Sequence, residues 1–221
     1  MKKIAYVLFS TAFLFGTACA DGWYGSAKLN NARQNLSSPL LTSPRVVERV
    51  ANPDSTKTFT GSFSVGYAFT EGWRLEGEYT TKSDASFDTR WAPFNPNVNR
   101  MQVTSQRLMI NGYKDIPITD WLSFYGMAGV GLARVDAEGY QSNAARRFAK
   151  NTQNNVAYSL GIGLNAKVGE KTTVGLGYRY IAMGDIETGH NTFANRINAR
   201  DEQLKGKLKE QNLFLEARVL F

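Results

Sequence analysis

The amino-acid sequence predicts an all-β protein, an antiparallel barrel of eight strands, from three observations. Apolar and polar residues alternate with a period of two in eight segments, as they do in strands that separate two environments. The connections between these segments are alternately short and long. The polar face combines small residues with isolated charges, which indicates an enclosed interior, because buried charges must be paired.

Four segments alternate most clearly. Between Thr58 and Thr70 the odd positions carry aromatic residues, Val or Gly, and the even positions are small or polar. The segments 155–168 and 173–180 repeat this pattern with their apolar residues at even positions. The last segment, 212–221, has apolar residues at odd positions and ends in Phe221. Alternation of this length is typical of strands with one apolar face.

Weaker alternation predicts four further strands, at about 23–31, 73–82, 107–113 and 121–135. The short connections are 71–72, 115–120 and 169–171, and the long ones, predicted as loops, are 34–57, 83–100, 137–153 and 184–209. Residues 101–106 and 204–211 either extend the strands or belong to these loops. Short turns at one end and long loops at the other are typical of a bacterial outer-membrane barrel.

A soluble β-barrel or β-sandwich is the alternative, because its strands alternate as well. The mean hydropathy of −0.33 favours it, but an average conceals apolar and polar residues that alternate one by one. In a soluble barrel the apolar face would point into the core, whereas here the polar face looks enclosed. Aromatic residues at strand ends fit the interfacial girdles of a membrane barrel: Tyr67, Phe69, Trp73, Tyr79, Trp121, Tyr158 and Tyr180. The membrane barrel is therefore the favoured prediction.

The charged residues of the polar face are expected to form an ion-pair network in the lumen. They are Arg74, Glu76, Glu78, Arg107, Arg179, Glu216 and Arg218. Buried charges of this kind need partners. Because eight strands enclose an interior that side chains just fill, no open pore is expected.

The N-terminal residues predict a cleaved secretory signal peptide. Two lysines precede an apolar run that ends at Phe15, and small residues follow up to Ala20. The run is shorter than the roughly 20 residues that a membrane-spanning helix needs. A lipid anchor on Cys19 would be the competing fate. We therefore expect a signal peptide at residues 1–20 and a barrel at 21–221, the latter without cysteine.

Several stretches resemble opacity-type and OmpA-like outer-membrane barrels. Asn111-Gly-Tyr113 and the Gly-rich segment 121–131 resemble one motif of that family, and segment 158–184 resembles the two strands that follow it. The end at Phe221 resembles the signal read by the outer-membrane insertion machinery. In size and layout the chain is similar to the adhesin and invasin group that includes Tia, Hek and PagN. The resemblance implies attachment to host surfaces, commonly through heparan sulfate proteoglycans, but does not extend to the long loops.

Charge marks candidate ligand-binding residues in the loops. Arg146, Arg147 and Lys150 lie together without a nearby acid in the sequence, and Arg196 and Arg200 lie in the fourth loop. Clustered cations bind polyanions by releasing counterions, and sulfated glycosaminoglycan is the polyanion found outside host cells. The alternative is that these side chains are only solvated.

Aromatic residues mark a second candidate surface. Phe87, Trp91 and Phe94 fall in the predicted second loop, and exposed aromatic residues at this density usually indicate a contact site. The alternative is that this loop packs on its neighbours and covers the mouth of the barrel.

Three lysines are candidates for lipid contact. Lys205, Lys207 and Lys209 share the odd parity of the outward-facing residues of the last strand. If that strand continues, they point outward just above the membrane, where they would meet the phosphates of lipopolysaccharide.

No catalytic site, metal site or cofactor is predicted. Enzymes among small outer-membrane barrels need a base, usually His, near a nucleophile or carboxylate, and His190 is the single histidine, in a loop. The sequence thus predicts a monomeric adhesin or invasin of the bacterial outer membrane with surface-exposed loops. Its expected partners are a host glycosaminoglycan or receptor protein, lipopolysaccharide and the insertion machinery, and not nucleic acid. Ail-type serum resistance and a purely structural barrel are the alternative functions.

Overall fold

The computed structural model describes residues 22–51, 55–94 and 96–221, and the predicted signal peptide at 1–20 lies outside them. The strands are β1 (Gly22–Leu41), β2 (Glu48–Ala51), β3 (Thr56–Ala68), β4 (Trp73–Ala92), β5 (Asn99–Pro117), β6 (Leu122–Gln141), β7 (Arg147–Lys167), β8 (Thr172–Glu187) and β9 (Leu204–Leu220). One 3-10 turn, η1 (Thr70–Gly72), joins β3 to β4. Within the described ranges, no helix has the length and apolar character needed to cross a membrane.

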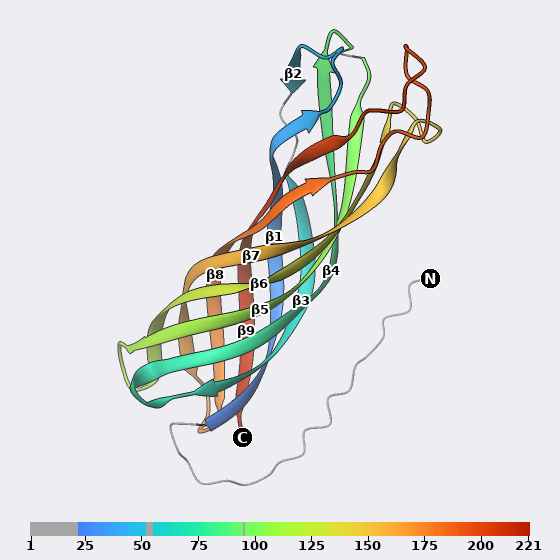
Figure 1. Cartoon of the computed structure of the whole chain (residues 1–221). Helices are drawn as coiled ribbons and strands as arrows, with labels where there is room; N and C mark the ends of the chain where they lie inside the picture. Colours follow the sequence, from blue (N-terminus) through green and yellow to red (C-terminus); the bar gives the residue numbers. More distant parts are fainter. Residues whose placement is uncertain (1–21, 52–54, 95) are drawn as a thin grey trace, which may run out of the picture.

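Eight of the strands close into a ring. Their order is β4-β3-β1-β9-β8-β7-β6-β5, and β5 pairs again with β4. All of these pairings are antiparallel. Strand β2 pairs with the far end of β4 outside the ring (Figure 1). The predicted eight-stranded antiparallel barrel is therefore confirmed.

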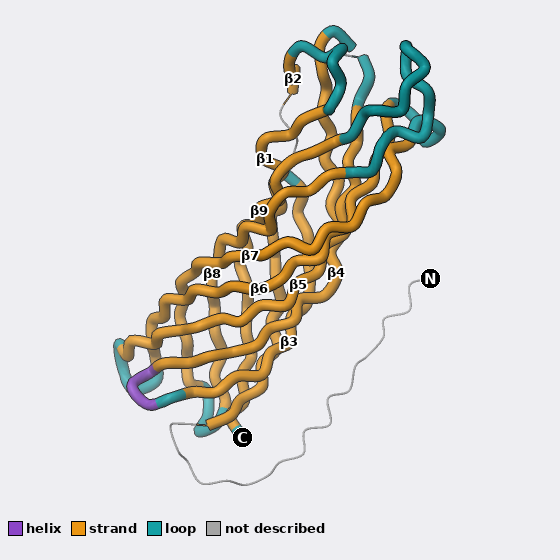
Figure 2. Tube along the Cα trace, in the orientation of Figure 1, coloured by secondary structure: helices purple, strands orange, loops and turns teal. Residues whose placement is uncertain are grey.

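The two ends of the barrel differ. At one end, which we call the turn end, short turns at 69–72, 118–121 and 168–171 connect the strands. The beginning of β1 and the end of β9 meet there, since the Phe221 amide donates to the Trp23 carbonyl over 3.0 Å. At the opposite, loop end, longer segments join β1 to β3, β4 to β5, β6 to β7 and β8 to β9 (Figure 2).

The predicted loop boundaries were wrong, because the strands continue much further toward the loop end. Residues 101–106 belong to β5 and 204–211 to β9, so both extend the barrel. Among the described residues, the segments outside the long strands at this end are 42–51, 55, 93–94, 96–98, 142–146 and 188–203. The physical reason is that the inward and outward faces exchange their polarity along most of the long strands, β3 excepted.

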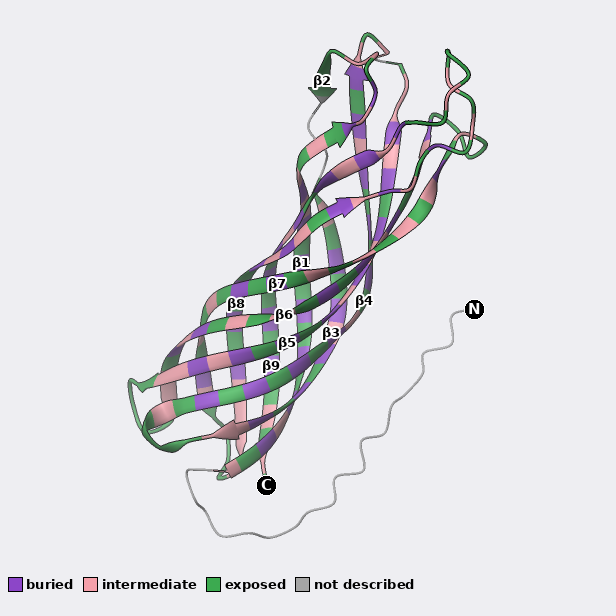
Figure 3. Ribbon diagram, in the orientation of Figure 1, coloured by how far each residue is buried: buried purple, intermediate pink, exposed green. Residues whose placement is uncertain are grey.

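In the turn-end half, the outer surface is apolar and the interior is polar. Exposed apolar side chains such as Leu29, Phe63, Leu108 and Leu160 form a belt around the outside of the barrel, which we call the apolar belt. This is the surface predicted to face lipid. The inward positions of the same strands are mostly polar, charged or Gly, and they include one buried cluster of Tyr113, Tyr125, Met127 and Phe214. Figure 3 shows the regular exchange of buried and exposed residues along each strand.

In the loop-end half, the arrangement is reversed. The interior is one apolar cluster of Leu36, Leu41, Ala85, Phe87, Trp91, Met101, Val103, Met109, Ala133, Val135, Phe148, Ala157, Ile181, Met183, Ile186, Leu204 and Leu208. The outward positions there are mostly polar or charged, for example Lys82, Asp84 and Arg134. Each large apolar side chain buried in this way stabilises the fold by about 1.5–3 kcal/mol. This half is therefore built like a soluble barrel.

A β-bulge in β4 lies at the junction of the two halves. Thr80 pairs with Arg107 and Ser83 pairs with Ser105, so two residues of β4 face the single residue Gln106. Before the bulge the outward positions of β4 are odd-numbered, and after it they are even-numbered. Such an extra residue bends a strand and redirects its side chains.

Glycines of the turn-end half make room for tyrosine rings. A Cβ added at Gly163 or at Gly177 would collide with the hydroxyl of Tyr125, and one added at Gly66 would collide with the ring of Tyr24. Tyr125 and Tyr24 are fully buried. The Gly-rich inward face is thus the complement of large interior side chains.

Candidate functional site

The predicted lumen residues lie as follows. Arg74, Glu76, Glu78, Arg107, Arg179 and Glu216 are buried inside the barrel, and Arg218 is half-buried near the turn end. Lys28 of β1, which sequence reasoning missed, lies at the centre of the group. Its even parity, shared with the other polar residues of the first strand, was the signal that could have found it.

Direct ion pairs connect the lumen charges. Lys28 Nζ pairs with Glu76, lies 2.6 Å from Glu78 Oε2 and donates to the Tyr113 hydroxyl over 3.1 Å. Arg179 Nη2 lies 2.7 Å from Glu78 Oε1, and its Nη1 donates to the other carboxylate oxygen over 3.0 Å. A carboxylate held by two cations satisfies the requirement for paired buried charge.

Two further pairs involve acids that the sequence did not assign to the lumen. Arg107 Nη2 lies 2.9 Å from Glu210 Oε1, and Arg74 Nε lies 2.5 Å from Asp115 Oδ2. Glu210 and Asp115 were missed because they fell between predicted strands. Cations and carboxylates of the interior balance: Lys28, Arg74, Arg107, Arg179 and Arg218 face Glu76, Glu78, Asp115, Glu210 and Glu216. This network braces the barrel and offers no excess charge to a ligand.

His190 is exposed in segment 188–203, where its carbonyl accepts a hydrogen bond from the Ala149 amide over 3.0 Å. In the part of the chain that the structure describes, no three His, Cys, Asp or Glu side chains are placed to hold a metal ion.

The loop end carries a small depression, which we call the tip cleft. Its volume is about 50 Å³. It is lined by Leu41, Ser43, Arg45, Val46, Phe94, Asn97, Gln141, Arg146, Asn195, Arg196 and Glu202. These residues come from all four loop-end connections and the strand ends beside them. Three arginines from three different connections therefore converge on one site.

Arg45 joins two loops of the tip cleft. Its Nη2 lies 2.6 Å from Glu202 Oε1 and 3.5 Å from Asp201 Oδ1, and the Ser43 hydroxyl donates to Glu202 over 3.0 Å. The hydrogen bond to Glu202 raises the pKa of Arg45 above its ordinary value. Arg45 is thus a charged group whose charge is already compensated.

Arg146 and Arg196 are held by neutral groups. Arg146 donates to Gln141 Oε1 from Nε over 3.1 Å and from Nη2 over 2.5 Å, and its guanidinium lies 4.2 Å from the centre of the Phe193 ring. The guanidinium of Arg196 lies 5.1 Å from the centre of the Phe94 ring. Among the described residues neither forms an ion pair. Cation–π contacts orient a cation without neutralising it, so both charges are available.

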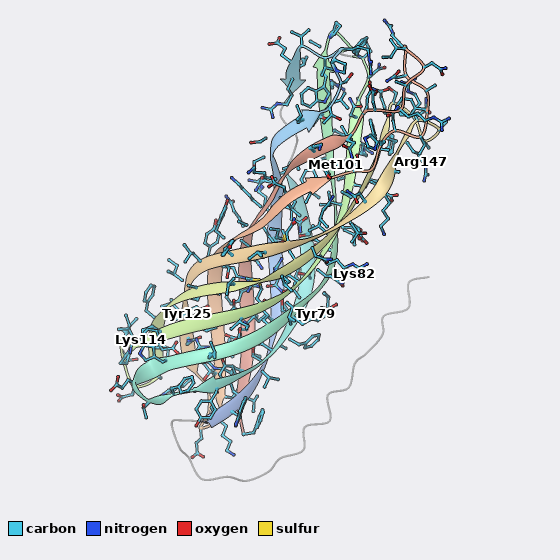
Figure 4. The ribbon with its side chains drawn as sticks, in the orientation of Figure 1. Tyr79, Lys82, Met101, Lys114, Tyr125 and Arg147 are labelled. Carbon is cyan, nitrogen blue, oxygen red and sulfur yellow. The ribbon has the colours of Figure 1, made fainter. Side chains whose placement is uncertain are left out.

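The other predicted loop cations are dispersed. Arg147 is exposed at the loop end, where Figure 4 labels it, and donates from Nε to the Ala144 carbonyl over 3.1 Å. Arg200 is exposed in segment 188–203. Lys150 lies on the outer wall and pairs with Asp136 of β6 over 2.9 Å. The structure thus brings Arg146 and Arg196 to one site and places Lys150 elsewhere.

The expectation that Phe87 and Trp91 lie on an exposed loop was wrong. Both belong to β4, and their side chains are buried in the apolar core of the loop-end half. Inward positions of β4 are odd-numbered after the bulge, which directs both rings into the barrel. Phe94 is half-buried and lines the tip cleft. Of the three aromatic candidates, only Phe94 therefore reaches a surface where a ligand can bind.

The three predicted lipid-contact lysines lie on β9 with partial or full exposure. Lys205 lies 2.7 Å from Glu187 and Lys207 lies 3.5 Å from Asp185. Lys209 has no ion pair among the described residues. Acids of β8 therefore compensate two of the three lysines.

Sequence reasoning also missed Arg45, Phe193 and Glu202. Each of them contacts a residue of another loop, and the spacing of residues in the sequence does not predict contacts between loops.

Comparison with known proteins relates this architecture to a family. Residues 8–200 match the family model described as "Outer membrane protein beta-barrel domain". A protein of Rickettsia akari named "Putative adhesin" is 27% identical over 236 residues, covering 100% of this chain and 99% of the relative. A "Putative adhesin" of Rickettsia prowazekii is 27% identical over 206 residues, covering 86% and 87%.

Solved structures agree on the fold. The crystal structure of Neisserial surface protein A matches with a TM-score of 0.55 and 18% identity, covering 90% of this chain and 97% of that chain. The crystal structure of OprG from Pseudomonas aeruginosa matches with a TM-score of 0.57 and 12% identity, again covering 90% and 97%.

Proposed function

The chain belongs to the outer membrane protein β-barrel domain family, and from that membership we propose that it is a surface adhesin whose tip cleft binds anionic groups on host cells. The observation that carries the proposal is the convergence of Arg146 and Arg196 at the loop end, each oriented by an aromatic ring and left without a carboxylate partner among the described residues.

The chemistry of the tip favours a sulfate or carboxylate group as the ligand. Guanidinium groups bind such anions through two parallel hydrogen bonds. A cleft of about 50 Å³ suits one such group rather than a whole sugar. The exposed side chains of Arg147 and Arg200 lie at the same end of the barrel and extend the basic surface for a longer polyanion. A sulfated glycosaminoglycan has both properties, a repeated small anion and length.

The loop-end half supports this role by raising the tip. From Lys82, β4 continues to Ala92, which at about 3.3 Å per residue and a tilt of about 40° raises the loops on the order of 25 Å above the apolar belt. The apolar core keeps this half rigid, so the cleft is presented without a flexible stalk. Curated relatives over the full length of the chain carry the name "Putative adhesin", which supports the same function.

Binding at one tip would be weak and salt-sensitive, because its contacts are exposed charges. Many copies on one cell would add such contacts into firm attachment.

The test compares bacteria that express the protein with an empty strain, on heparin surfaces and on cultured host cells, across a salt series. We expect greater binding that falls as salt rises, and a several-fold loss for Arg146→Ser and Arg196→Ser. Lys167→Ser, which removes an exposed cation at the turn end, is the control and should bind as the wild type does. If expressing cells bind no better than the empty strain, the adhesin proposal is contradicted. If their binding does not change with salt concentration, the polyanion ligand is contradicted.

The same strains also separate adhesion from the alternative function. Survival in serum that rises with expression, without any gain in cell binding, would replace adhesion by serum resistance.

A further inference from the structure

A second hollow lies on the outer wall of the barrel, far along the strands from the tip cleft. This wall groove has a volume of about 200 Å³ and is lined by Lys82, Thr104, Ser105, Gln106, Arg134 and Asp136. The residues belong to the neighbouring strands β4, β5 and β6. Figure 4 shows Lys82 further toward the loop end than Tyr79 on the same strand.

The wall groove lies directly above the apolar belt. Tyr79, Leu108 and Leu132 pair across β4, β5 and β6 and form one exposed row of that belt. The next outward positions are Gln106 and Arg134, which also pair with each other. Two residues of a strand span about 7 Å. The groove therefore lies where the hydrocarbon of a bilayer ends and its headgroups begin.

The bulge of β4 creates the groove. Because Thr81 and Lys82 together face Gln106, the strand carries one residue too many at this height. The extra residue turns Lys82 outward beside the pair formed by Gln106 and Arg134. A flat three-stranded wall would lack this hollow.

The groove is lined mainly by donors, although the Thr104 hydroxyl is already engaged by the Asp84 carboxylate at 2.6 Å, just outside the lining. Lys82 and Arg134 have no ion pair within 4.0 Å in the described chain. Tyr79 donates its hydroxyl to Gln106 Oε1 over 3.2 Å, which leaves the amide nitrogen of Gln106 to donate. Asp136 is the one acid in the lining, and its carboxylate is engaged by Lys150 at 2.9 Å and by the Thr152 hydroxyl at 2.6 Å. The site therefore favours an anion.

Cations are also placed against one another on the strands next to the groove, since β3 pairs with β4 and β1 with β3. Arg33 of β1 and Lys57 of β3 are directly opposite each other and both exposed. Like charges directly opposite on neighbouring strands destabilise a sheet. An anionic layer around the barrel at this height would relieve that repulsion.

We propose that the wall groove binds a phosphate of lipopolysaccharide in the outer leaflet, with the acyl chains of the same molecule lying on the apolar row below. A phosphate matches the ammonium, guanidinium and amide donors of the groove. The adjoining row of Tyr79, Leu108 and Leu132 matches hydrocarbon, which a soluble anion does not possess. The ligand thus bridges the two surfaces that the barrel places one above the other.

The test uses the purified, refolded barrel in neutral detergent micelles, with binding measured by native mass spectrometry. The probes are lipid A with both phosphates, the same lipid A without phosphates, and inorganic phosphate. We expect the phosphorylated lipid to bind about tenfold more tightly than the dephosphorylated one, as two charge-assisted contacts would allow. The double variant Lys82→Ser/Arg134→Ser should lose most of this preference.

The matched control removes two outward cations that already have carboxylate partners. Lys205→Ser/Lys207→Ser should keep the full preference, and the heat-modifiable gel migration of both double variants should show that they fold. Equal binding of the two lipids, an unchanged preference in Lys82→Ser/Arg134→Ser, or inorganic phosphate binding as tightly as the lipid would each overturn the proposal. Variants of the wall groove should leave host-cell binding unchanged. The experiments therefore test the wall-groove proposal and the tip-cleft proposal independently of each other.

Discussion

Arg179 and Glu78 form an ion pair across the full width of the barrel, with 2.7 Å between Nη2 and Oε1. Arg179 lies on β8 and Glu78 on β4, which are four strands apart in either direction around the ring. Arg107 of β5 and Glu210 of β9 are placed in the same way. These two ion pairs therefore connect opposite walls of the barrel.

Loss of the ion pairs of Glu78 should remove much of the stability of the barrel. In Glu78→Gln, Lys28 and Arg179 lose a shared carboxylate inside the barrel, and breaking a buried pair costs about 3–5 kcal/mol. The free energy of unfolding in urea, measured by tryptophan fluorescence of the protein in lipid vesicles, should fall by that amount. Asn154→Ala on the exposed wall of β7 is the control. If the free energy of unfolding falls by less than about 1 kcal/mol in Glu78→Gln, these ion pairs are not needed for stability.

The glycines beneath Tyr125 should resist even a methyl group. In Gly177→Ala the new Cβ collides with the Tyr125 hydroxyl and with the Phe214 ring, and such overpacking costs about 1–3 kcal/mol. Gly126→Ala is a matched control, because a Cβ there meets no atom within 4 Å. The urea midpoint should drop in the first variant and stay near the wild-type value in the second. Equal midpoints would contradict the close packing of Tyr125.

The apolar core of the loop-end half should be separable from the rest of the barrel. Phe87→Ala removes a fully buried ring from that core, at a cost of about 3–5 kcal/mol. We expect faster amide hydrogen exchange at 83–92 and 99–106, with 107–113 still protected. Phe63→Ala, on the apolar belt, should leave the exchange of the loop-end half unchanged. Exchange that rises uniformly along β5 in Phe87→Ala would instead mean that the two halves unfold as one unit.

The compensated arginine of the tip should become a ligand group once its acid is removed. Glu202→Gln leaves an amide oxygen for the Ser43 hydroxyl but removes the nearer of the two carboxylates that compensate Arg45, so that only Asp201 at 3.5 Å remains. Cells bearing this variant should stay bound to heparin at higher salt than wild-type cells. Glu138→Gln makes the same change of net charge on the exposed wall of β6 and should have a smaller effect. If both variants raise the salt concentration needed for detachment by the same amount, heparin binding depends only on the net charge of the protein.

The turn-end half was predictable from sequence because its strands repeat one simple pattern. Residues such as Phe59, Phe63 and Val65 alternate with small residues, and membrane-facing and lumen-facing positions differ in every pair. The loop-end half was not, because Phe87 and Trp91 are apolar residues that point inward on strands whose earlier apolar residues point outward. If the odd-numbered residues of β4 are assigned to the outer face along the whole strand, the alternation fails beyond the bulge. The second part of the strand then looks like a loop in the sequence.

The tip cleft was predictable only in part. The sequence indicated that Arg146 and Arg196 belong to loops, since both lie between alternating segments. It contained no signal that Phe193 and Phe94 would orient them or that Glu202 would neutralise Arg45. Those partners come from different loops, and only the closed ring of strands brings them together.

The exchange of polarity halfway along the strands limits how deeply a bilayer can cover the barrel. A wall with Lys82, Asp84 and Arg134 on its outside is costly to bury in hydrocarbon, whereas the surface that includes Leu108 and Leu160 is apolar. The barrel therefore has one favourable depth in a membrane, because movement in one direction would bury charges and movement in the other would expose the apolar belt to water.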